Sequence, residues 1–299
     1  MPLAYGRKLQ KIVLESARGR SLGARFAPWL RLRPRHLAPA FSGAAEPRTG
    51  LSMGQHCEQM VQEWGITRRE QDELAYASHS KAAAAWREGF FRDLAVPFGG
   101  LAADNNVRAD TSLEKLAKLK PSFAADGTLT AGNSTPMTDG AAAVLLASED
   151  WARARGLPVQ AYLTFGKVAA VDFLQDEGLL MAPAYAVPRM LEDAGITLQD
   201  FDFYEIHEAF AAQVLCTLAA WESAGFCRDR LGRERPLGSI DRAKLNVNGS
   251  SLAVGHPFAA TGARIVATLA KLIDQRGGGR GLVSICTAGG MGVTAIVER

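Results

Sequence analysis

Three segments of the sequence place reactive side chains next to turns that follow apolar runs. His256 lies in the glycine- and alanine-rich stretch 248–264, Cys286 ends an apolar run before a glycine turn, and His207 follows the apolar segment 201–206. A neutral imidazole can accept a proton, and a thiol can donate one or attack a carbonyl carbon. Two histidines and a cysteine at such turns therefore suit acyl transfer through a thioester.

Each of these residues also has a plainer interpretation when it is considered alone. A single buried cysteine usually packs as a small apolar side chain, and a single histidine is usually structural. The sequence around His256 favours a catalytic role. Pro257 suits the first turn of a helix that we predict over 257–276, which would place His256 at the N-terminus of that helix. The positive end of that helix would lower the pKa of His256 and keep its imidazole neutral.

Motifs for other chemistries are missing from the sequence. The four cysteines form no CxxC pair and no HExxH segment is present, so we expect neither a structural zinc site nor another bound metal. No GxGxxG follows an apolar strand, and neither GxxxxGKS nor GxxxxGKT occurs. Dinucleotide binding and P-loop nucleotide binding therefore lack their fingerprints.

The composition is that of a globular protein with room for a sizeable core. Of the 299 residues, 47% are hydrophobic and 22% are charged, which excludes extended disorder, collagen and a disulfide scaffold. The apolar runs fall far short of the roughly 20 residues that span a bilayer. The net charge of +3, from 34 basic and 31 acidic residues, does not favour nucleic-acid binding. Four cysteines and no signal-peptide pattern point to a reducing cytoplasm.

The first 50 residues are strongly basic. They contain eight Arg and two Lys against Glu15 and Glu46, a local charge of +8. Segments that are rich in Arg and poor in acidic residues occur in mitochondrial transit peptides and in arms that bind polyanions. Here prolines interrupt the segment and its apolar residues are not confined to one helical face. We therefore favour a solvated basic surface, with a helix over 3–20 and an irregular connector over 21–50.

A helical region precedes an alternation of strands and helices. Ser52 and Gly65 bound one predicted helix, and the capping box of Thr67 and Glu70 starts a second that ends at Gly89. Further on we predict helices near 111–119 and at 184–194, 208–221 and 257–276, and strands at 128–134, 141–147, 160–170, 201–206, 244–248, 281–289 and 292–297. Such alternation indicates a layered α/β domain, and the repeated tripeptide Thr-Ala-Gly at 130 and 287 favours two similar halves.

Four ordered segments closely resemble the active-site loops of thiolases, the acetyl-CoA acyltransferases. They are Asn-Gly-Ser-Ser-Leu-Ala-Val-Gly-His-Pro-Phe-Ala-Ala-Thr-Gly-Ala-Arg at 248–264, Cys-Thr-Ala-Gly-Gly-Met-Gly at 286–292, His-Glu-Ala-Phe-Ala-Ala-Gln at 207–213 and Thr-Ala-Gly-Asn-Ser-Thr-Pro-Met-Thr-Asp-Gly-Ala-Ala-Ala at 130–143. The resemblance covers residues 50–299. On these motifs the chain is identified as a member of this family.

The resemblance implies a role for each reactive residue. His256 matches the histidine that activates the nucleophilic cysteine of thiolases and contributes to an oxyanion site. Cys286 matches their second cysteine, which exchanges a proton with the substrate α-carbon or with the CoA thiol. His207 stands where many thiolases have Asn. Those that resemble the β-subunit of the β-oxidation trifunctional complex have His there, which helps to hold a water in the other oxyanion site.

The resemblance also implies how CoA is bound. Ser250, Ser251 and Phe258 would line the tunnel for its pantetheine arm, and residues of about 25–125 would form a helical loop domain that covers it. CoA is a substrate in this chemistry, so no cofactor is implied, and neither is nucleic acid. Members of the family form homodimers or homotetramers, or associate with a hydratase/dehydrogenase subunit.

The expected fold is the layered α/β/α/β/α architecture of thiolases, with two mixed five-stranded sheets and an incomplete N-terminal half. Residues 1–150 would be the remainder of the N-terminal domain and 151–299 the C-terminal domain. The segment that carries the nucleophilic cysteine of thiolases has no counterpart here, which suggests an N-terminal truncation. Cys57 is the only cysteine of the N-terminal part that could take its place, although its frame matches a loop-domain helix.

The expected function is thiolytic cleavage of a 3-ketoacyl-CoA, or the reverse Claisen condensation of acetyl-CoA. Such a reaction belongs to fatty-acid β-oxidation or related acyl-CoA metabolism, and we expect it in the cytoplasm. The alternative that the sequence leaves open is a catalytically dead fragment that at most binds CoA.

Overall fold

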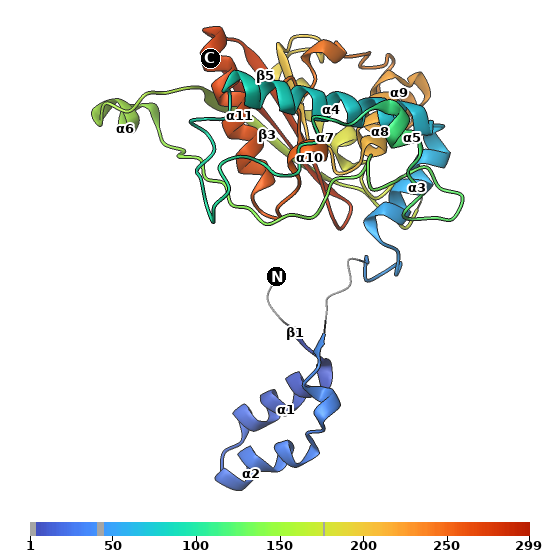
Figure 1. Ribbon diagram of the computed structural model, residues 1–299, viewed down its shortest axis with the longest axis vertical. Coiled ribbons are helices and arrows are strands. Elements are labelled where there is room, and N and C mark those ends of the chain that lie inside the picture. Colours follow the sequence, from blue (N-terminus) through green and yellow to red (C-terminus); the bar gives the residue numbers. More distant parts are fainter. Residues whose placement is uncertain (1–3, 41–44, 176) are drawn as a thin grey trace. The chain divides into compact units, whose positions relative to one another are not determined.

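The computed structural model describes residues 4–40, 45–175 and 177–299, which form two compact units (Figure 1). One unit ends at Ala45 and the other spans Glu46–Arg299. The first unit contains α1 (Arg7–Arg18), α2 (Leu22–Phe26), 3₁₀ turns at Ala27–Arg31 and Pro34–His36, and an antiparallel pair of β1 (Ala4–Tyr5) with β2 (Pro39–Ala40). The predicted basic helix over 3–20 corresponds to α1, while residues 1–3 and 41–44 lie outside the described ranges.

Among the described residues, the second unit contains one four-stranded sheet of mixed orientation. Its strands are β3 (Tyr162–Ala170), β6 (Met291–Glu298), β5 (Arg280–Thr287) and β4 (Phe203–Ile206), in that spatial order. β6 is antiparallel to β3 and β5, whereas β4 is parallel to β5. The register sets Ile206 opposite Ser284, so that the chain leaving β4 passes beside the end of β5.

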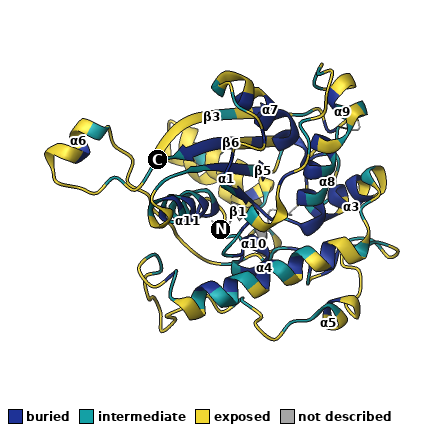
Figure 2. Cartoon of the chain, turned by 90° about the horizontal axis from the view of Figure 1, so that it is seen from above, coloured by how far each residue is buried: buried dark blue, intermediate teal, exposed yellow. Residues whose placement is uncertain are grey.

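Helices cover both faces of this sheet (Figure 2). Leu282 of β5 packs with residues of α7 (Ala182–Ala194) and α8 (Ala211–Glu222), whereas its neighbour Val283 packs with α11 (Thr261–Arg276). Successive side chains of a strand point to opposite faces. Consequently α7 and α8 cover one face and α11 covers the other.

The predicted helical region is confirmed with its caps. α3 (Met53–Trp64) begins with a capping box at Ser52, and α4 (Arg68–Glu88) begins with one at Thr67. Gly65 and Gly89 end these helices in the left-handed conformation. The remaining short elements are α5 (Leu113–Ala117), α6 (Glu149–Ala154), α9 (Ala224–Asp229), α10 (Ser251–Val254) and a 3₁₀ turn at Arg242–Lys244.

Three predicted strands are wrong. In 128–134 the backbone amides are taken by side chains, since Glu58 accepts from Leu129 N at 2.8 Å and Asn133 accepts from Thr130 N at 2.7 Å. Residues 141–147 form no strand and are exposed to solvent. In 244–248 only Leu245 bridges to β4, and the next residue, Asn246, has a φ of 44° that does not fit a strand.

The mixed α/β fold class is confirmed. The number of sheets and strands that the resemblance implied stays a prediction, as does the domain division at residue 150. Within the described ranges, no helix is long and apolar enough to cross a membrane.

Candidate active site

His207 and His256 meet in the second unit, with ring centroids 4.3 Å apart. His207 directly follows β4, and its backbone N–H donates to the carbonyl of Ser284 on β5 at 2.9 Å. His256 lies between α10 and α11, and its backbone N–H donates to Pro136 O at 3.2 Å. Two of the three predicted reactive residues therefore share one site.

The loop that carries His256 is held against β4 by Asn246. Its side-chain oxygen accepts from Ile206 N at 2.9 Å, and its amide donates to Ile206 O at 2.9 Å and to Glu208 Oε1 at 2.7 Å. The chain then approaches α4 so closely that a Cβ on Gly249, at a φ of 71°, would lie 2.4 Å from Ser78 O. Only glycine fits this position, because both the space and the dihedral angle exclude a side chain.

The imidazole of His207 is buried, with 1% of its surface exposed. Its Nδ1 lies 2.7 Å from Ser251 Oγ, and that hydroxyl also accepts from Arg264 Nη2 at 2.8 Å. Burial, followed by the electrostatic effects of the neighbouring His256 and of the Arg264 guanidinium, holds the pKa of His207 well below its usual value. The ring is therefore neutral at physiological pH.

His256 is also neutral, but for a different reason from the one that the sequence suggested. Its pKa is lowered mainly by burial and then by Arg264. The following helix, α11, begins only at Thr261, so His256 does not stand at the helix terminus. The Thr261 hydroxyl lies 2.6 Å from His256 Nδ1, and this hydrogen bond holds the Nδ1 edge of the ring.

Two buried glutamates and the half-buried Arg264 surround the histidines, and the sequence analysis gave none of the three a role. Arg264, Glu205 and Glu208 are close enough to perturb one another's pKa values. Burial raises the pKa of Glu205 to about 8 and also raises that of Glu208. Glu208 is held by hydrogen bonds from Ser78 Oγ at 2.7 Å and Leu252 N at 3.1 Å. The one signal available beforehand was that both glutamates flank His207 in the sequence.

Cys286 lies at the end of β5, two residues after the carbonyl that holds His207. Its side chain is buried in the core cluster that also contains Phe210 and Tyr185, and it pairs across the hairpin with Gly292. Burial raises the pKa of the thiol to about 12. The group is therefore a neutral thiol that can hold and release a proton, rather than a standing thiolate.

The other three cysteines are free, buried thiols. Cys57 on α3 belongs to the same core cluster as Cys216, and burial raises its pKa well above the usual value. Reactive cysteines have lowered pKa values and some exposure. Cys57 has neither property, which favours a packing role over that of a substitute nucleophile.

The residues expected to line the pantetheine tunnel occupy two environments. Ser250 and Ser251 are buried, and Ser251 is engaged by His207 and Arg264 as described above. Phe258 is 61% exposed, and its ring lies 4.9 Å from that of His256. Phe258 is thus placed at the surface next to the histidine pair. The tunnel itself stays a prediction.

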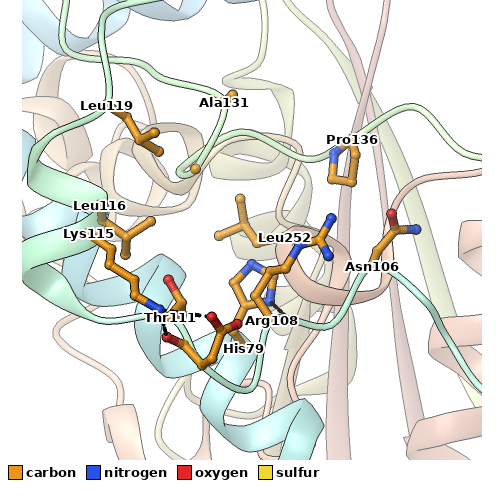
Figure 3. A pocket seen from close by; sticks show the side chains of 12 residues that line it. His79, Asn106, Arg108, Thr111, Lys115, Leu116, Leu119, Ala131, Pro136 and Leu252 are labelled. Carbon is orange, nitrogen blue, oxygen red and sulfur yellow. Dashed lines mark hydrogen bonds and ion pairs between the residues drawn. The ribbon is translucent and has the colours of Figure 1, made fainter.

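A pocket of about 290 Å³ opens beside α10 (Figure 3). Its lining includes Leu252, the neighbour of Ser251, together with the basic side chains of His79, Arg108 and Lys115. Lys115 also bonds to Asp110, which lines the same pocket. None of these lining residues was predicted individually. His79 lies on α4, Leu252 lies on α10, three lining residues lie within the motif at 130–143, and the other seven come from the region between α4 and that motif. Within the described ranges, no three His, Cys, Asp or Glu side chains are arranged to hold a metal ion.

Comparison with known proteins agrees with this fold and these motifs. Residues 36–150 match the family model described as "Thiolase, N-terminal domain", and residues 157–299 match "Thiolase, C-terminal domain". The chain belongs to the thiolase family.

One relative and two solved structures are similar to this chain over at least 85% of its length. A 3-ketoacyl-CoA thiolase of Yersinia pestis (strain Pestoides F) is 44% identical over 305 residues, an alignment that covers 100% of this chain and 70% of that protein. The crystal structure of the Bacillus anthracis acetyl-CoA acetyltransferase superposes with a TM-score of 0.75 at 36% identity, over 90% of this chain and 65% of that one. For human mitochondrial 3-ketoacyl-CoA thiolase the TM-score is 0.71 at 30% identity, over 85% and 61%. The chain thus spans less than two thirds of these two solved structures.

Proposed function

We propose that the protein is an acyl-CoA acyltransferase that cleaves a 3-ketoacyl-CoA with CoA, or runs the reverse Claisen condensation. The observation that carries the proposal is the pair of neutral histidines, one buried and one half-buried, whose ring centroids lie 4.3 Å apart next to the strand end that carries Cys286. Two neutral imidazoles and a protonated thiol are the groups that this chemistry needs to move protons and to stabilise an oxyanion.

In the cleavage direction, a cysteine thiolate adds to the ketone carbon, and the bond between C2 and C3 breaks. The acyl group stays on sulfur, and the electron pair moves to C2 of the departing acetyl-CoA, which takes a proton from Cys286. The CoA thiol then returns a proton to the Cys286 thiolate and attacks the acyl-enzyme. His256 serves as the base for the acyl-accepting cysteine, and His207 stabilises an oxyanion.

The acyl-accepting cysteine of this mechanism has no counterpart among the four cysteines of the sequence. Residues 1–299 therefore supply the proton-transfer and oxyanion groups, and the acyl-forming step needs a further thiolate. Cys286 cannot take that place as well, because it must move the proton while another sulfur holds the acyl group.

CoA would bind through the pocket beside α10 and through Ser250, Ser251 and Phe258. The cationic side chains of Arg108 and Lys115 suit the phosphates of CoA, and Leu252 provides an apolar part of the lining. CoA enters as a substrate, with no cofactor required. A partner copy, or a hydratase/dehydrogenase subunit, would complete the assembly. The free thiols of the described residues support a reducing compartment such as the cytoplasm.

A thiolysis assay tests the proposal in a protein that carries the family's nucleophile segment together with residues 1–299. We expect the thioester of acetoacetyl-CoA to disappear on addition of CoA, with two molecules of acetyl-CoA formed. The isolated residues 1–299 should bind CoA and show negligible thiolysis. Hydrolysis to free acetoacetate, or no turnover once the segment is present, would contradict the proposal.

A further inference from the structure

Arg264, Ser251 and His207 form a chain of hydrogen bonds in the interior of the second unit. Arg264 Nη2 lies 2.8 Å from Ser251 Oγ, which in turn lies 2.7 Å from His207 Nδ1. Both Ser251 and His207 are buried, and Arg264 lies near the start of α11. Sequence reasoning assigned Ser251 to CoA binding and gave Arg264 no role.

The direction of these hydrogen bonds follows from the chemistry of the three groups. A guanidinium only donates, so Ser251 Oγ accepts from Arg264. The hydroxyl has one proton of its own, and His207 Nδ1 is the other partner within hydrogen-bond distance. If Nδ1–H donated instead, the oxygen would accept twice and a buried hydroxyl proton would have no acceptor, which is costly. The hydroxyl therefore donates to Nδ1.

We propose that Arg264, acting through Ser251, fixes His207 in the tautomer that carries its proton on Nε2. A neutral imidazole whose Nδ1 accepts must hold its hydrogen on the other nitrogen. His207 Nε2 is buried and has no hydrogen-bond partner among the described residues. It is thus kept as a donor for a water or a substrate oxygen. Arg264 and Ser251 are positioning residues, and the catalytic meaning of the donor rests on the proposed function.

His256 differs from His207 in the hydrogen bonding of its Nδ1. Thr261 Oγ1 lies 2.6 Å from His256 Nδ1, but it also lies 3.3 Å from the carbonyl of Pro257. The Thr261 proton therefore has a second acceptor, and the hydroxyl can either donate to Nδ1 or accept from it. No tautomer is imposed on His256, which suits a residue that must take up and release a proton on Nε2.

The test is nitrogen NMR of the 299-residue chain labelled with ¹⁵N-histidine. The chain has five histidines, so the His207 signals are assigned by their loss in His207→Asn. We expect a protonated Nε2 and an unprotonated Nδ1 with the shift of a hydrogen-bond acceptor. A protonated Nδ1 with a bare Nε2 would overturn the proposal. The readout needs no substrate, so it holds or fails independently of thiolysis.

Two serine variants locate the cause of the tautomer. Ser251→Ala removes the bridging hydroxyl, and we expect the His207 signals to move toward a mixture of both tautomers. Ser250→Ala is the matched control, because Ser250 is equally buried and lies 3.5 Å from Arg264 Nη2 but makes no hydrogen bond to His207 in the described structure. Its His207 signals should stay unchanged. An unchanged His207 spectrum in Ser251→Ala would contradict the proposed action of Arg264 through Ser251. Arg264→Lys keeps a cationic donor, and we expect this variant to retain the Nε2–H form of His207.

Discussion

The loops around His207 and the segment 137–147 are both rich in small residues, yet the structure treats them in opposite ways. His207, Ser251 and Glu208 are buried, and each has polar partners from another element. Leu145 and Leu146, in contrast, are 73% and 67% exposed although they are apolar. Burial in this chain therefore follows from which elements meet, and not from hydrophobicity alone.

The same contrast extends to the sheet. β5 is buried over most of its length, because β4 and β6 flank it and helices cover both faces. Within the described part of the chain, β3 pairs with one neighbour, β6, and most of its length is exposed (Figure 2). Its exposed residues include Leu163, Phe165 and Val168. Exposed apolar strands and segments of this kind mark surfaces that associate with other chains or aggregate.

The largest effect is expected at His256. In the protein that carries the nucleophile segment, His256→Ala should lower thiolysis about 10²–10⁴-fold, because the base of the acyl-accepting cysteine is lost. His56→Gln is the control, since His56, like His256, has a lowered pKa and contacts a threonine hydroxyl, here at 2.8 Å from Thr49, and it is more buried than His256. Steady-state kinetics should show the control within about twofold of the wild type, as it lies outside the proposed machinery. Equal losses of thiolysis in both variants would mean that the effect at His256 comes from a less stable fold and not from the loss of a base.

Glu58 tests whether buried polar contacts stabilise the turn before the 130–143 motif. Its carboxylate accepts from Thr128 N at 2.9 Å and Leu129 N at 2.8 Å. Glu58→Ala would leave two amide donors without a partner, and we expect the free energy of unfolding to fall by about 3 kcal/mol. Glu73→Ala, which removes an exposed partner of Arg69, should change it by about 0.5 kcal/mol or less. Denaturant unfolding measures both, and similar losses would contradict the distinction.

The raised pKa of Glu205 predicts that the free energy of unfolding depends on pH. Its folded pKa of about 8 exceeds the reference value of 4.5, so the folded state keeps a proton that the unfolded chain releases. The contribution of Glu205 therefore lowers the free energy of unfolding as the pH rises from about 4.5 to 8, and it is constant above pH 8. Relative to the wild type, Glu205→Gln should gain stability across this window, whereas Glu73→Gln should show no such trend. A constant difference between pH 5 and 8 for Glu205→Gln would contradict the raised pKa.

The smallest effect is expected in the exposed apolar segment. Leu145→Ala should change the free energy of unfolding by about 0.5 kcal/mol or less, because this side chain buries little surface. Leu129→Ala, earlier in the same part of the chain, should cost about 2–5 kcal/mol, because Leu129 is fully buried. Thermal or denaturant unfolding of the two variants gives the comparison. A large loss at Leu145 would show that this segment is covered in solution.

Local rules predicted the helices well and the site in part. The capping boxes at Ser52 and Thr67 mark the starts of α3 and α4, because these contacts lie within one helical turn. The sequence predicted His207, His256 and Cys286 as reactive residues at turns, whereas the contact between the two histidine rings is a finding of the structure. The roles carried over from that resemblance stay predictions.

The failures have a common physical origin. The segments 128–134 and 244–248 have strand-like composition. In the first, Glu58 and Asn133 accept from the backbone amides of Leu129 and Thr130, and in the second, Asn246 leaves strand geometry at a φ of 44° and bonds through its side chain to Ile206. Arg264 was overlooked for a related reason. A single sequence does not show that an arginine near the start of a helix will lie, half-buried, close to one glutamate on a strand and another just after it.

The most direct test of the proposed function compares two buried cysteines in the thiolysis assay with the nucleophile segment present. Cys286→Ala removes the proposed proton carrier, and we expect turnover of acetoacetyl-CoA to fall at least about 10²-fold. Cys216→Ala removes a thiol that packs in the same core cluster, and turnover should stay within about threefold of the wild type when the variant is folded. A Cys286→Ala protein that is folded and as active as Cys216→Ala would contradict the assignment of this site.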